Sequence, residues 1–302
     1  MRLTVIDVGG TYIKYACMTE EAEIISRGKV PTPMSGRDEF ISTIVDIHKS
    51  MPESTGIAIS LPGIIDADKG YCFTSGALKY NDDFYICDAI YEKCPVNISI
   101  ENDAKCAAFA EVSLGSLKDV DDGFVMVFGT GIGGTFIKNR QIHRGHHFAS
   151  GEISFIITNE HGNIVESDIF GSQCGALGLC KLYAAKKNIP IESVDGIMFF
   201  DAVKNGDSTA IDCLNQITRA IAVQISNIQM ILDPQRIAIG GGISVQPMFI
   251  EYIRRHLADI YANSEFSLPH AEVVTCEFYN DANLIGALQC HLEKFKNNKT
   301  ST

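Results

Sequence analysis

Hydrophobic and polar residues along the chain follow a strand period in some segments and a helix period in others. Short apolar runs occupy residues 3–8, 56–61, 124–128 and 236–239, and residues 96–100 alternate between polar and apolar. Short runs of this kind, bounded by glycine or polar residues, are typical of strands. The pattern therefore predicts strands in both halves of the chain.

The longest helical pattern lies in the second half. Apolar residues at positions 211, 214, 217, 221, 225, 228 and 232 are three or four residues apart, which predicts an amphipathic helix. Asp233 and Pro234 end it, because a residue that precedes proline disfavours the helical conformation. We expect further helices over residues 103–114, from about residue 247, and over residues 284–295. Strands that alternate with helices predict an α/β fold.

A six-residue segment near the start of the chain recurs in the second half. Residues 9–14 read GGTYIK and residues 133–138 read GGTFIK, and each copy follows an apolar run and leads into another. We expect a strand, a tight glycine turn and a strand in each copy, since paired glycines permit positive φ. The alternative is two unrelated hairpins. Because a length of 302 residues predicts two domains, and the copies head the two halves, we interpret the repeat as a duplication.

Composition narrows the class of protein. Subtracting 37 acidic from 25 basic residues gives a net charge of −12, which argues against a nucleic-acid partner. No apolar run approaches the roughly 18 residues of a membrane span, and Asp7 interrupts the first apolar run too early for a signal peptide. We therefore expect a cytoplasmic protein without a membrane partner. Of its ten cysteines, we expect the eight scattered ones to be reduced and mostly buried, whereas Cys174 and Cys180 lie close enough together in sequence to be considered separately.

Two glycine-rich segments after predicted strands could bind phosphate through backbone N–H groups. A third could lie against an adenine or a phosphate, or could be only a packing turn. The first segment follows Asp7, whose carboxylate could hold a hydrated Mg²⁺. One such loop alone is more often an ordinary turn, but two loops of matched sequence could hold a triphosphate between them. The spacing of a P-loop is absent. The three segments comprise Gly9, Gly10 and Thr11; Gly129, Thr130, Gly131, Gly133 and Gly134; and Gly240, Gly241 and Gly242.

A carboxylate at a predicted strand-to-helix junction is the best candidate for acid–base chemistry. Asp103 follows Asn102 there, and an Asp in this position is often only a helix cap. Beside phosphate loops it could instead accept the proton of an attacking hydroxyl. Glu152, in a segment rich in glycine, histidine and serine, could hydrogen-bond a polyol.

These segments, in this order, resemble the ROK family (repressor, open reading frame, kinase) of bacterial sugar kinases, within the actin/hexokinase/Hsp70 ATPase superfamily. The resemblance covers nearly the whole chain and is carried by residues 7–11, 60–63, 100–104, 129–134, 151–152 and 239–242. It implies two RNase H-like (actin-like ATPase) lobes with ATP and sugar in the cleft between them. We place the lobes at residues 1–118, joined by the helix 284–302, and at residues 119–283.

The resemblance also implies roles for single residues. Asp103 becomes the base that activates the sugar hydroxyl, and Gly76, Asn102 and Glu152 become sugar-contacting residues together with it. Lys14 falls where the family often has a basic residue near the phosphates. With Lys14 added, the predicted ATP- and phosphate-binding set is Asp7, Gly9, Gly10, Thr11, Lys14, Gly129, Thr130, Gly131, Gly133, Gly134, Gly240, Gly241 and Gly242.

One departure from the family pattern concerns its structural zinc. Phe155 stands where most members have a histidine ligand, and around Cys174 and Cys180 other residues replace two cysteines, or the zinc segment is deleted. Four nitrogen or sulfur ligands are then not available, so we expect no structural zinc. This variant resembles the β-glucoside kinase branch, as does the stretch 70–84. Because the missing histidine normally contacts the sugar near its anomeric end, Phe155 could instead line a path for a β-linked substituent.

The sequence thus predicts an ATP- and Mg²⁺-dependent kinase that phosphorylates the 6-hydroxyl of a β-glucoside or glucose-type hexose. We expect a homodimer. The alternatives are a plain glucokinase or another hexose kinase acting on N-acetylmannosamine or fructose, and a sugar-sensing ROK regulator without catalysis. The regulator is disfavoured because it needs an N-terminal DNA-binding segment, whereas the first phosphate loop here begins at Asp7. A third functional class is an actin-like nucleotide switch that acts on protein partners.

Overall fold

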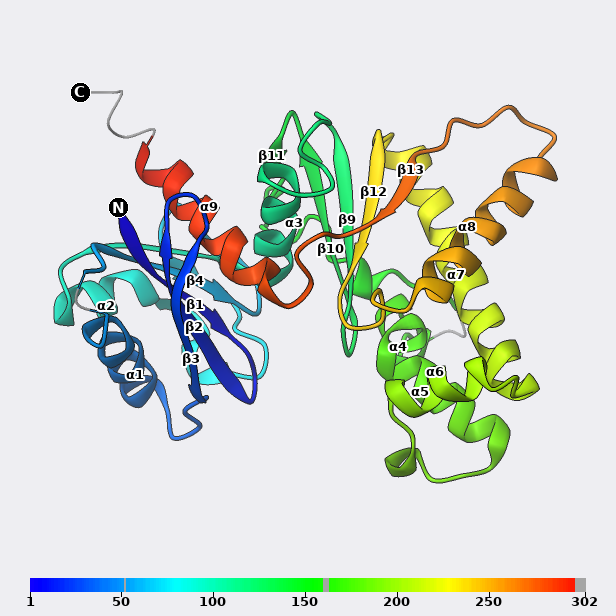
Figure 1. Cartoon of the computed structure of the whole chain (residues 1–302), viewed down its shortest axis with the longest axis horizontal. Coiled ribbons are helices and arrows are strands. Elements are labelled where there is room, and N and C mark those ends of the chain that lie inside the picture. Colours follow the sequence, from blue (N-terminus) through cyan, green and yellow to red (C-terminus); the bar gives the residue numbers. More distant parts are fainter. Residues whose placement is uncertain (52, 160–162, 297–302) are drawn as a thin grey trace. The chain divides into compact units, whose positions relative to one another are not determined.

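The chain folds into two compact units. The computed structural model describes residues 1–51, 53–159 and 163–296. Unit 1 comprises residues 1–114, 144–149 and the chain from 281 onward, and unit 2 comprises residues 115–143 and 150–280. In Figure 1 the red C-terminal helix accordingly belongs to the unit that holds the blue N-terminal strands. The division into lobes at residues 118 and 283 stays a prediction, and residues 297–302 of its last helix lie outside the described part of the chain.

A five-stranded mixed sheet forms the centre of unit 1. Its order is β3-β2-β1-β4-β8, in which β2 is antiparallel to both β3 and β1, and β1, β4 and β8 are parallel to one another. A small antiparallel sheet, β5-β6-β7, lies in the same unit. The strands are β1 (Arg2–Val8), β2 (Tyr12–Thr19), β3 (Ile24–Pro31), β4 (Gly56–Leu61), β5 (Ile65–Asp66), β6 (Tyr71–Cys72), β7 (Phe84–Tyr85) and β8 (Asn97–Asn102).

Helices from both ends of the chain cover this sheet. One buried cluster joins Phe40 and Ile44 of α1 to Ile6, Ile59 and other strand residues. The C-terminal helix α9 packs so tightly on α3 that a Cβ at Gly286 would lie 1.7 Å from the Cys106 carbonyl oxygen. The helices are α1 (Arg37–Lys49), η1 (Lys79–Asn81), α2 (Ile86–Lys93), α3 (Asp103–Ser113) and α9 (Ala282–Lys296).

Unit 2 repeats the same sheet plan. Its order is β11-β10-β9-β12-β13, with β9, β10 and β11 antiparallel and β9, β12 and β13 parallel. The strands are β9 (Gly123–Phe128), β10 (Ile132–Lys138), β11 (Gln141–Ile142), β12 (Arg236–Gly240) and β13 (Glu272–Thr275). The helices are η2 (Ile153–Phe155), η3 (Glu166–Asp168), α4 (Phe170–Cys174), α5 (Ala176–Lys187), η4 (Ile191–Ser193), α6 (Gly196–Lys204), α7 (Ser208–Leu232) and α8 (Pro247–Ala262), with η5 (Tyr279–Asp281) at the boundary to unit 1.

The expected helices and strands are present, and two sheets of equal order are what a duplication predicts. The helix expected from the apolar positions 211–232 is α7, which ends at Asp233 as predicted. The repeated six-residue segment, however, does not mark equivalent positions. Val8 and Phe128 both end a first strand and Tyr12 and Ile132 both begin a second one, so the offset is 128 − 8 = 120 residues rather than 124.

The turn expected at Gly133 and Gly134 was therefore wrong. Both glycines lie inside β10, paired with Val127 and Met126, and the turn is formed by residues 129–131. Gly134 is required by packing rather than by a turn. A Cβ there would lie 2.6 Å from the Gly151 carbonyl oxygen.

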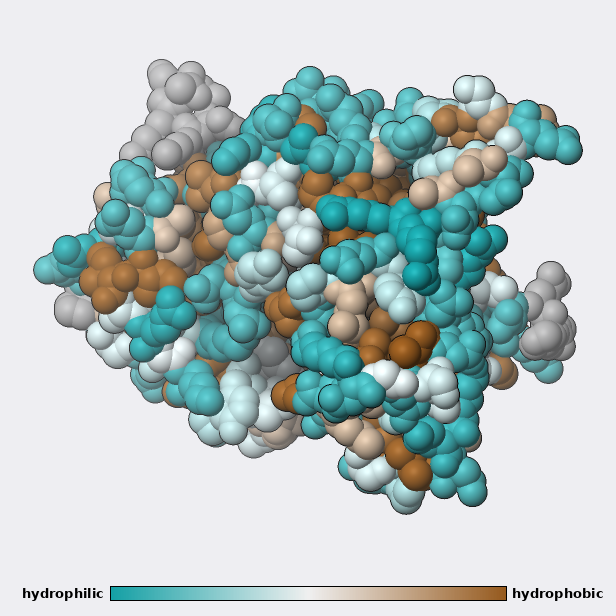
Figure 2. All heavy atoms as spheres, turned by 45° about the vertical axis from the view of Figure 1, so that its right-hand side comes forward, coloured by the Kyte–Doolittle hydropathy of each residue, from teal (hydrophilic) through white to brown (hydrophobic). Residues whose placement is uncertain are grey.

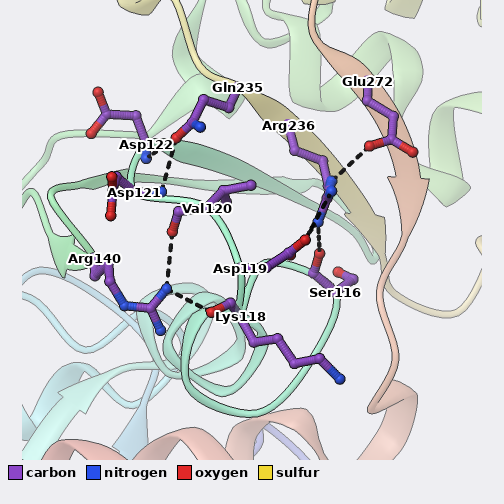
Figure 3. Close-up of polar contacts among 10 residues, drawn as sticks. All are labelled: Ser116, Lys118, Asp119, Val120, Asp121, Asp122, Arg140, Gln235, Arg236 and Glu272. Carbon is purple, nitrogen blue, oxygen red and sulfur yellow. Dashed lines mark hydrogen bonds and ion pairs between the residues drawn. The ribbon is translucent and has the colours of Figure 1, made fainter.

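The segment where the chain enters unit 2, residues 115–122, is fastened by side chains of that unit (Figure 3). Arg236 donates to the Ser116 carbonyl at 2.7 Å and forms ion pairs with Asp119 and Glu272. Arg140 donates to the Lys118 and Val120 carbonyls, and the Gln235 side-chain oxygen accepts from the N–H groups of Asp121 and Asp122. Residues 115–122 are thus a series of turns held by side-chain contacts.

Hydrophilic residues predominate on the face drawn in Figure 2, and hydrophobic residues form separate small groups among them. Scattered exposed hydrophobic residues are normal for a folded protein. Among the described residues, no helix is long and apolar enough to cross a membrane.

Candidate active site

Several predicted site residues of unit 1, among them Asp7, Asn102 and Asp103, lie at the carboxyl ends of parallel strands. Asp7 of β1 is in register with Ser60 of β4, and Ser60 is in register with Glu101 of β8. Ligands of open α/β sheets bind at the carboxyl ends of parallel strands. This edge of the sheet is therefore the natural place for a site in unit 1.

Asp7 is buried at this edge and held in place by three side chains. Its Oδ1 accepts from Asn283 Nδ2 at 2.9 Å and from Ser60 Oγ at 3.3 Å, and its Oδ2 lies 3.8 Å from Lys14 Nζ. Asp7 and Lys14 are partners in the β1–β2 register. Asp7 and Lys14, two members of the predicted phosphate-binding set, are thus neighbours. No role was predicted for Asn283, which comes from α9.

The turn at residues 9–11 has its own anchor. Gly9 N–H donates to the Tyr12 carbonyl at 3.0 Å. The buried Thr32 donates its hydroxyl to the Gly9 carbonyl at 2.7 Å and its N–H to the Thr11 carbonyl at 3.0 Å. Gly10 and Thr11 are exposed. Thr32 thus fixes the shape of an exposed glycine turn, a role that no local sequence signal indicated.

Asn102 and Asp103 lie at the start of α3, where a polar side chain can either cap the helix or take part in chemistry. The N-cap of α3 is Asn102, whose Oδ1 accepts from Lys105 N–H at 3.1 Å. Asp103 is the first helical residue, and its Oδ1 accepts from Ala104 N–H at 2.8 Å and from Asn102 Nδ2 at 3.1 Å. Since Asn102 caps the helix, the Asp103 carboxylate is not needed as the cap.

Asn102 also holds the loop that follows β4. Its Nδ2 donates to the Gly63 carbonyl at 2.9 Å. Gly63 has φ +106°, and a Cβ there would lie 2.0 Å from the Thr74 carbonyl oxygen, so this loop and residues 74–76 are in direct contact. Gly76, with φ +60°, approaches Pro62. The structure therefore brings the predicted sugar residues Gly76, Asn102 and Asp103 into one neighbourhood.

The ion pair between Glu101 and Arg144 contacts the backbone of Asn102. Glu101 accepts from Arg144 Nη2 at 2.6 Å and from Arg144 Nε at 2.9 Å, and its other oxygen accepts from Asn102 N–H at 2.9 Å. The Glu101 carboxylate raises the pKa of Arg144 against the opposing effect of burial. Arg144 thereby ties residues 144–149 to the end of β8. Glu101 lies in the motif 100–104, but no role was predicted for it or for Arg144.

Two glycine loops of unit 2 also lie at the carboxyl ends of parallel strands. The exposed Gly129 and Thr130 follow β9, and Gly240 ends β12. Gly241, with φ +91°, lies so close to Phe128 that a Cβ would be 2.3 Å from its carbonyl oxygen. The two glycine loops of unit 2 are therefore neighbours.

Three further contacts fasten the turn at residues 129–131. Ala176 N–H donates to the Gly129 carbonyl at 2.9 Å. Ser154 Oγ accepts from Ile132 N–H at 3.0 Å and donates to the Ile132 carbonyl at 2.8 Å. Because α5 begins at Ala176, this turn is attached to the start of a helix.

Glu152 is positioned by a close approach of two glycines. Gly151 has φ +89°, and a Cβ there would lie 2.4 Å from the Gly134 carbonyl oxygen. Glu152 follows it, half-buried, at the start of η2. Phe155 at the end of η2 is 68% exposed. Glu152, the two glycines of β10 and the loops at residues 129–131 and 240–242 belong to unit 2, whereas the other predicted site residues belong to unit 1.

The comparison with known proteins agrees with these motifs. The chain matches the ROK family over residues 3–294. It belongs to the ROK family. The resemblance inferred from the motifs is therefore confirmed.

Relatives of this ROK protein include kinases of several sugars. A beta-glucoside kinase of Klebsiella pneumoniae is 29% identical over 289 residues, which are 95% of each chain. A beta-glucoside kinase of Listeria monocytogenes is 28% identical over 295 residues, 97% of this chain and 98% of the relative. The solved structure of a ROK family protein from Streptococcus pneumoniae TIGR4 in complex with sucrose is 26% identical, with a TM-score of 0.89 and coverage of 98% of this chain and 100% of that one. Solved ROK hexokinase and glucokinase structures share the fold, so the predicted fold class of two RNase H-like α/β lobes is confirmed.

The donor set of this ROK protein fits a hydrated Mg²⁺ better than a zinc ion. Mg²⁺ on a nucleotide is held through phosphates, water and one or two carboxylates, and the anchored Asp7 offers one carboxylate. Within the described ranges, no group of three or more His, Cys, Asp or Glu side chains could hold a metal ion. Burial raises the pKa of the Cys174 thiol to about 12, which disfavours the thiolate that zinc requires. The absence of structural zinc stays a prediction, and one zinc per chain in a metal analysis would contradict it.

Proposed function

We propose that this ROK protein is an ATP-dependent sugar kinase that transfers the γ-phosphoryl group to the 6-hydroxyl of a β-glucoside or a glucose-type hexose. The observation that carries the proposal is the arrangement at the start of α3. There Asn102 acts as the cap, and Asp103 is fixed by two hydrogen bonds to one of its oxygens. A carboxylate oriented in this way at the carboxyl edge of a sheet can accept a hydroxyl proton.

In the proposed reaction, Asp103 takes the proton of the 6-hydroxyl while the hydroxyl oxygen forms a bond to the γ-phosphorus. The bond from that phosphorus to the β–γ bridging oxygen breaks, and ADP leaves with the electron pair. Mg²⁺, when bound with ATP, would neutralise phosphate charge. Asp7 would hold it, and backbone N–H groups of the turns at residues 9–11 and 129–131 would stabilise the phosphoryl oxygens.

The contacts of Asn102 support a positioning role in addition to sugar binding. Both amide hydrogens of its side chain are used, one for Gly63 and one for Asp103, and its oxygen accepts from Lys105. Asn102 would therefore orient the base and the loop next to it. Gly76 and Glu152 would contact the sugar, as the resemblance implies.

The names of two relatives and the ligand in one solved structure support a β-glucoside as the substrate of this protein. The two similar proteins from Klebsiella and Listeria are both named beta-glucoside kinases, and the Streptococcus structure holds sucrose, a disaccharide. An acceptor site with room for a substituent on the anomeric carbon accounts for both observations.

A coupled assay of ATP consumption with cellobiose, glucose, N-acetylmannosamine and fructose tests the proposal. We expect sugar-dependent ATP consumption, with cellobiose at least as good a substrate as glucose. Turnover of glucose alone would favour a plain glucokinase. Sugar binding without turnover would favour a sensor, and ATP hydrolysis that is independent of sugar would favour an actin-like switch. The expected homodimer stays a prediction that light scattering tests.

A further inference from the structure

Four aromatic side chains of unit 1 form one contiguous cluster. Tyr71 and Tyr85 are register partners in β6 and β7, with ring centroids 4.6 Å apart. Phe73 packs edge-on against Tyr71 at 5.0 Å. Phe148 stacks on Phe73 with centroids 5.6 Å apart and an interplanar angle of 27°. We call these four residues the aromatic cluster.

Two residues of the cluster are exposed and the other two, Tyr71 and Phe148, are half-buried, although the rings hold one another in place. Phe73 is 40% exposed and Tyr85 is 48% exposed. A single exposed ring needs no explanation, but rings that contact one another and still face solvent are a common feature of binding surfaces. The Tyr71 hydroxyl donates to Asp83 at 3.3 Å, which adds polar groups at the edge of the cluster.

Phe148 occupies an unusual backbone conformation. Its φ is +60°, a region that a bulky side chain rarely adopts. Its N–H donates to the Gly145 carbonyl at 3.4 Å, within the segment that Arg144 ties to Glu101. Strained residues of this kind persist where the surrounding contacts hold them, often at ligand sites.

Two separate connections place the stacked pair next to the candidate acceptor site. Phe73 N–H donates to the Ile64 carbonyl at 2.9 Å, and the preceding residue, Gly63, accepts from Asn102. Phe148 lies four residues after Arg144, which binds Glu101, and Glu101 in turn accepts from Asn102 N–H. Both rings are thus anchored to the immediate neighbours of Asn102 and Asp103.

We propose that the aromatic cluster, and above all Phe73 and Phe148, binds the substituent on the anomeric carbon of a β-glucoside: a second pyranose ring or an aryl ring. The inference rests on the proposed sugar kinase function. Aromatic rings offer broad apolar faces on which the C–H face of a pyranose or the face of an aryl ring can pack. Tyr71 and Asp83 would hydrogen-bond hydroxyl groups at the rim, so a second sugar fits the cluster at least as well as an aryl group.

The test compares selectivity in variants that remove one ring face at a time. Phe73→Leu and Phe148→Leu should lower the ratio of kcat/KM for cellobiose, and for phenyl β-glucoside, to kcat/KM for glucose by about three- to tenfold. Phe73→Tyr keeps the ring and should restore the ratio. Tyr91→Leu, which removes an exposed ring of α2 outside the cluster, is the matched control and should leave the ratio as it is.

Several results would overturn the inference while the kinase function stands. These are turnover of glucose with no β-glucoside accepted, an unchanged ratio in both leucine variants of the cluster, or a fall in the ratio for Phe155→Leu alone. If no sugar is phosphorylated, the proposed function fails instead. Calorimetric binding of phenyl β-glucoside without ATP then decides about the cluster. Binding that weakens in Phe73→Leu supports it, whereas equal binding in both proteins or none in the wild type contradicts it.

Discussion

Single side chains at the end of β8 determine what α3 can contribute to chemistry. Asn102 uses its side-chain oxygen to cap the helix and its amide hydrogens to hold Gly63 and Asp103. The Asp103 carboxylate is thereby oriented without serving as the cap. The same short segment, through Glu101, also fixes Arg144.

Replacing Asp103 with Asn tests its role as the base. The change keeps the shape of the side chain and its acceptance of the Ala104 hydrogen bond, but it removes the basicity. We expect kcat to fall by about 10²–10⁴ with sugar binding largely kept. Steady-state kinetics and sugar titration provide the measurement. A variant within about threefold of the wild type would exclude Asp103 as the base.

His291 should make the stability of unit 1 depend on pH. It is buried on α9 with Nδ1 2.9 Å from Ser99 Oγ, and burial lowers its pKa to about 4. Between pH 6.5 and 4 the unfolded chain binds more protons than the folded one, so the free energy of unfolding falls as pH falls through this range, by about 3 kcal/mol from this residue. Urea unfolding at pH 7 and 4.5 measures the loss. It should be smaller in His291→Gln, and an equal loss in both proteins would contradict the assignment.

For single residues, the sequence indicated which side chains could carry chemistry but not which distant side chains hold them in place. Asp7, Asn102 and Asp103 stand out because a carboxylate or amide at a strand end is a recognisable pattern. Asn283, Thr32 and Arg144 are ordinary polar residues in their local sequence. Their importance comes from contacts with residues 276, 23 and 43 positions away, respectively, which no local pattern can indicate.

Among the elements, the hairpin β9–β10 shows how packing decides where glycines are needed. Gly134 lies in mid-strand because Gly151 passes directly over it. The repeated sequence suggested a turn there, since two adjacent glycines more often form one. The duplication of the sheets is consistent with the interpretation of the repeat, yet its matching letters lie four residues out of structural register.

Gly151→Ala should be considerably more destabilising than an alanine at an unobstructed glycine. Both Gly151 (φ +89°) and Gly206 (φ +79°) have positive φ, but only Gly151 would bring a Cβ into collision with backbone, 2.4 Å from Gly134 O. We expect a loss of about 1–2 kcal/mol for Gly206→Ala and about 3 kcal/mol or more for Gly151→Ala. Chemical denaturation of the two variants measures the difference. Equal losses would mean that the backbone conformation, and not the close approach, makes Gly151 necessary.

Across the whole molecule, each unit is assembled from segments that are distant in sequence. Unit 1 takes α9 from the end of the described chain and residues 144–149 from its middle. The two α/β units could be expected from length and from the alternation of strands and helices. The excursion of residues 144–149 could not, because six residues carry no periodicity and their place is set by Arg144 and Phe148.

A substitution in α9 should therefore be felt in the N-terminal strands. Gly286→Val would force α9 away from the Cys106 carbonyl, and we expect hydrogen exchange to speed up in β1, β4 and β8 more than in β9 and β12. Mass spectrometry of exchanged peptides measures both sets. Gly196→Val, at a glycine of unit 2 with open space around it, is the control. Equal acceleration in the two units would contradict this division of the molecule.

The placement of α9 has a consequence for synthesis on the ribosome. Residues 1–114 emerge first, but the strand that carries Asp7 lacks Asn283, and α3 lacks its closest neighbour, until residues 281–296 have followed. Unit 2 has all of its residues by position 280. Domains generally fold as units as they emerge, so the half that is translated later can be completed earlier. Until α9 is made, residues 1–114 expose the apolar surface that α9 would cover. A nascent chain stalled shortly after residue 280 should therefore bind chaperones.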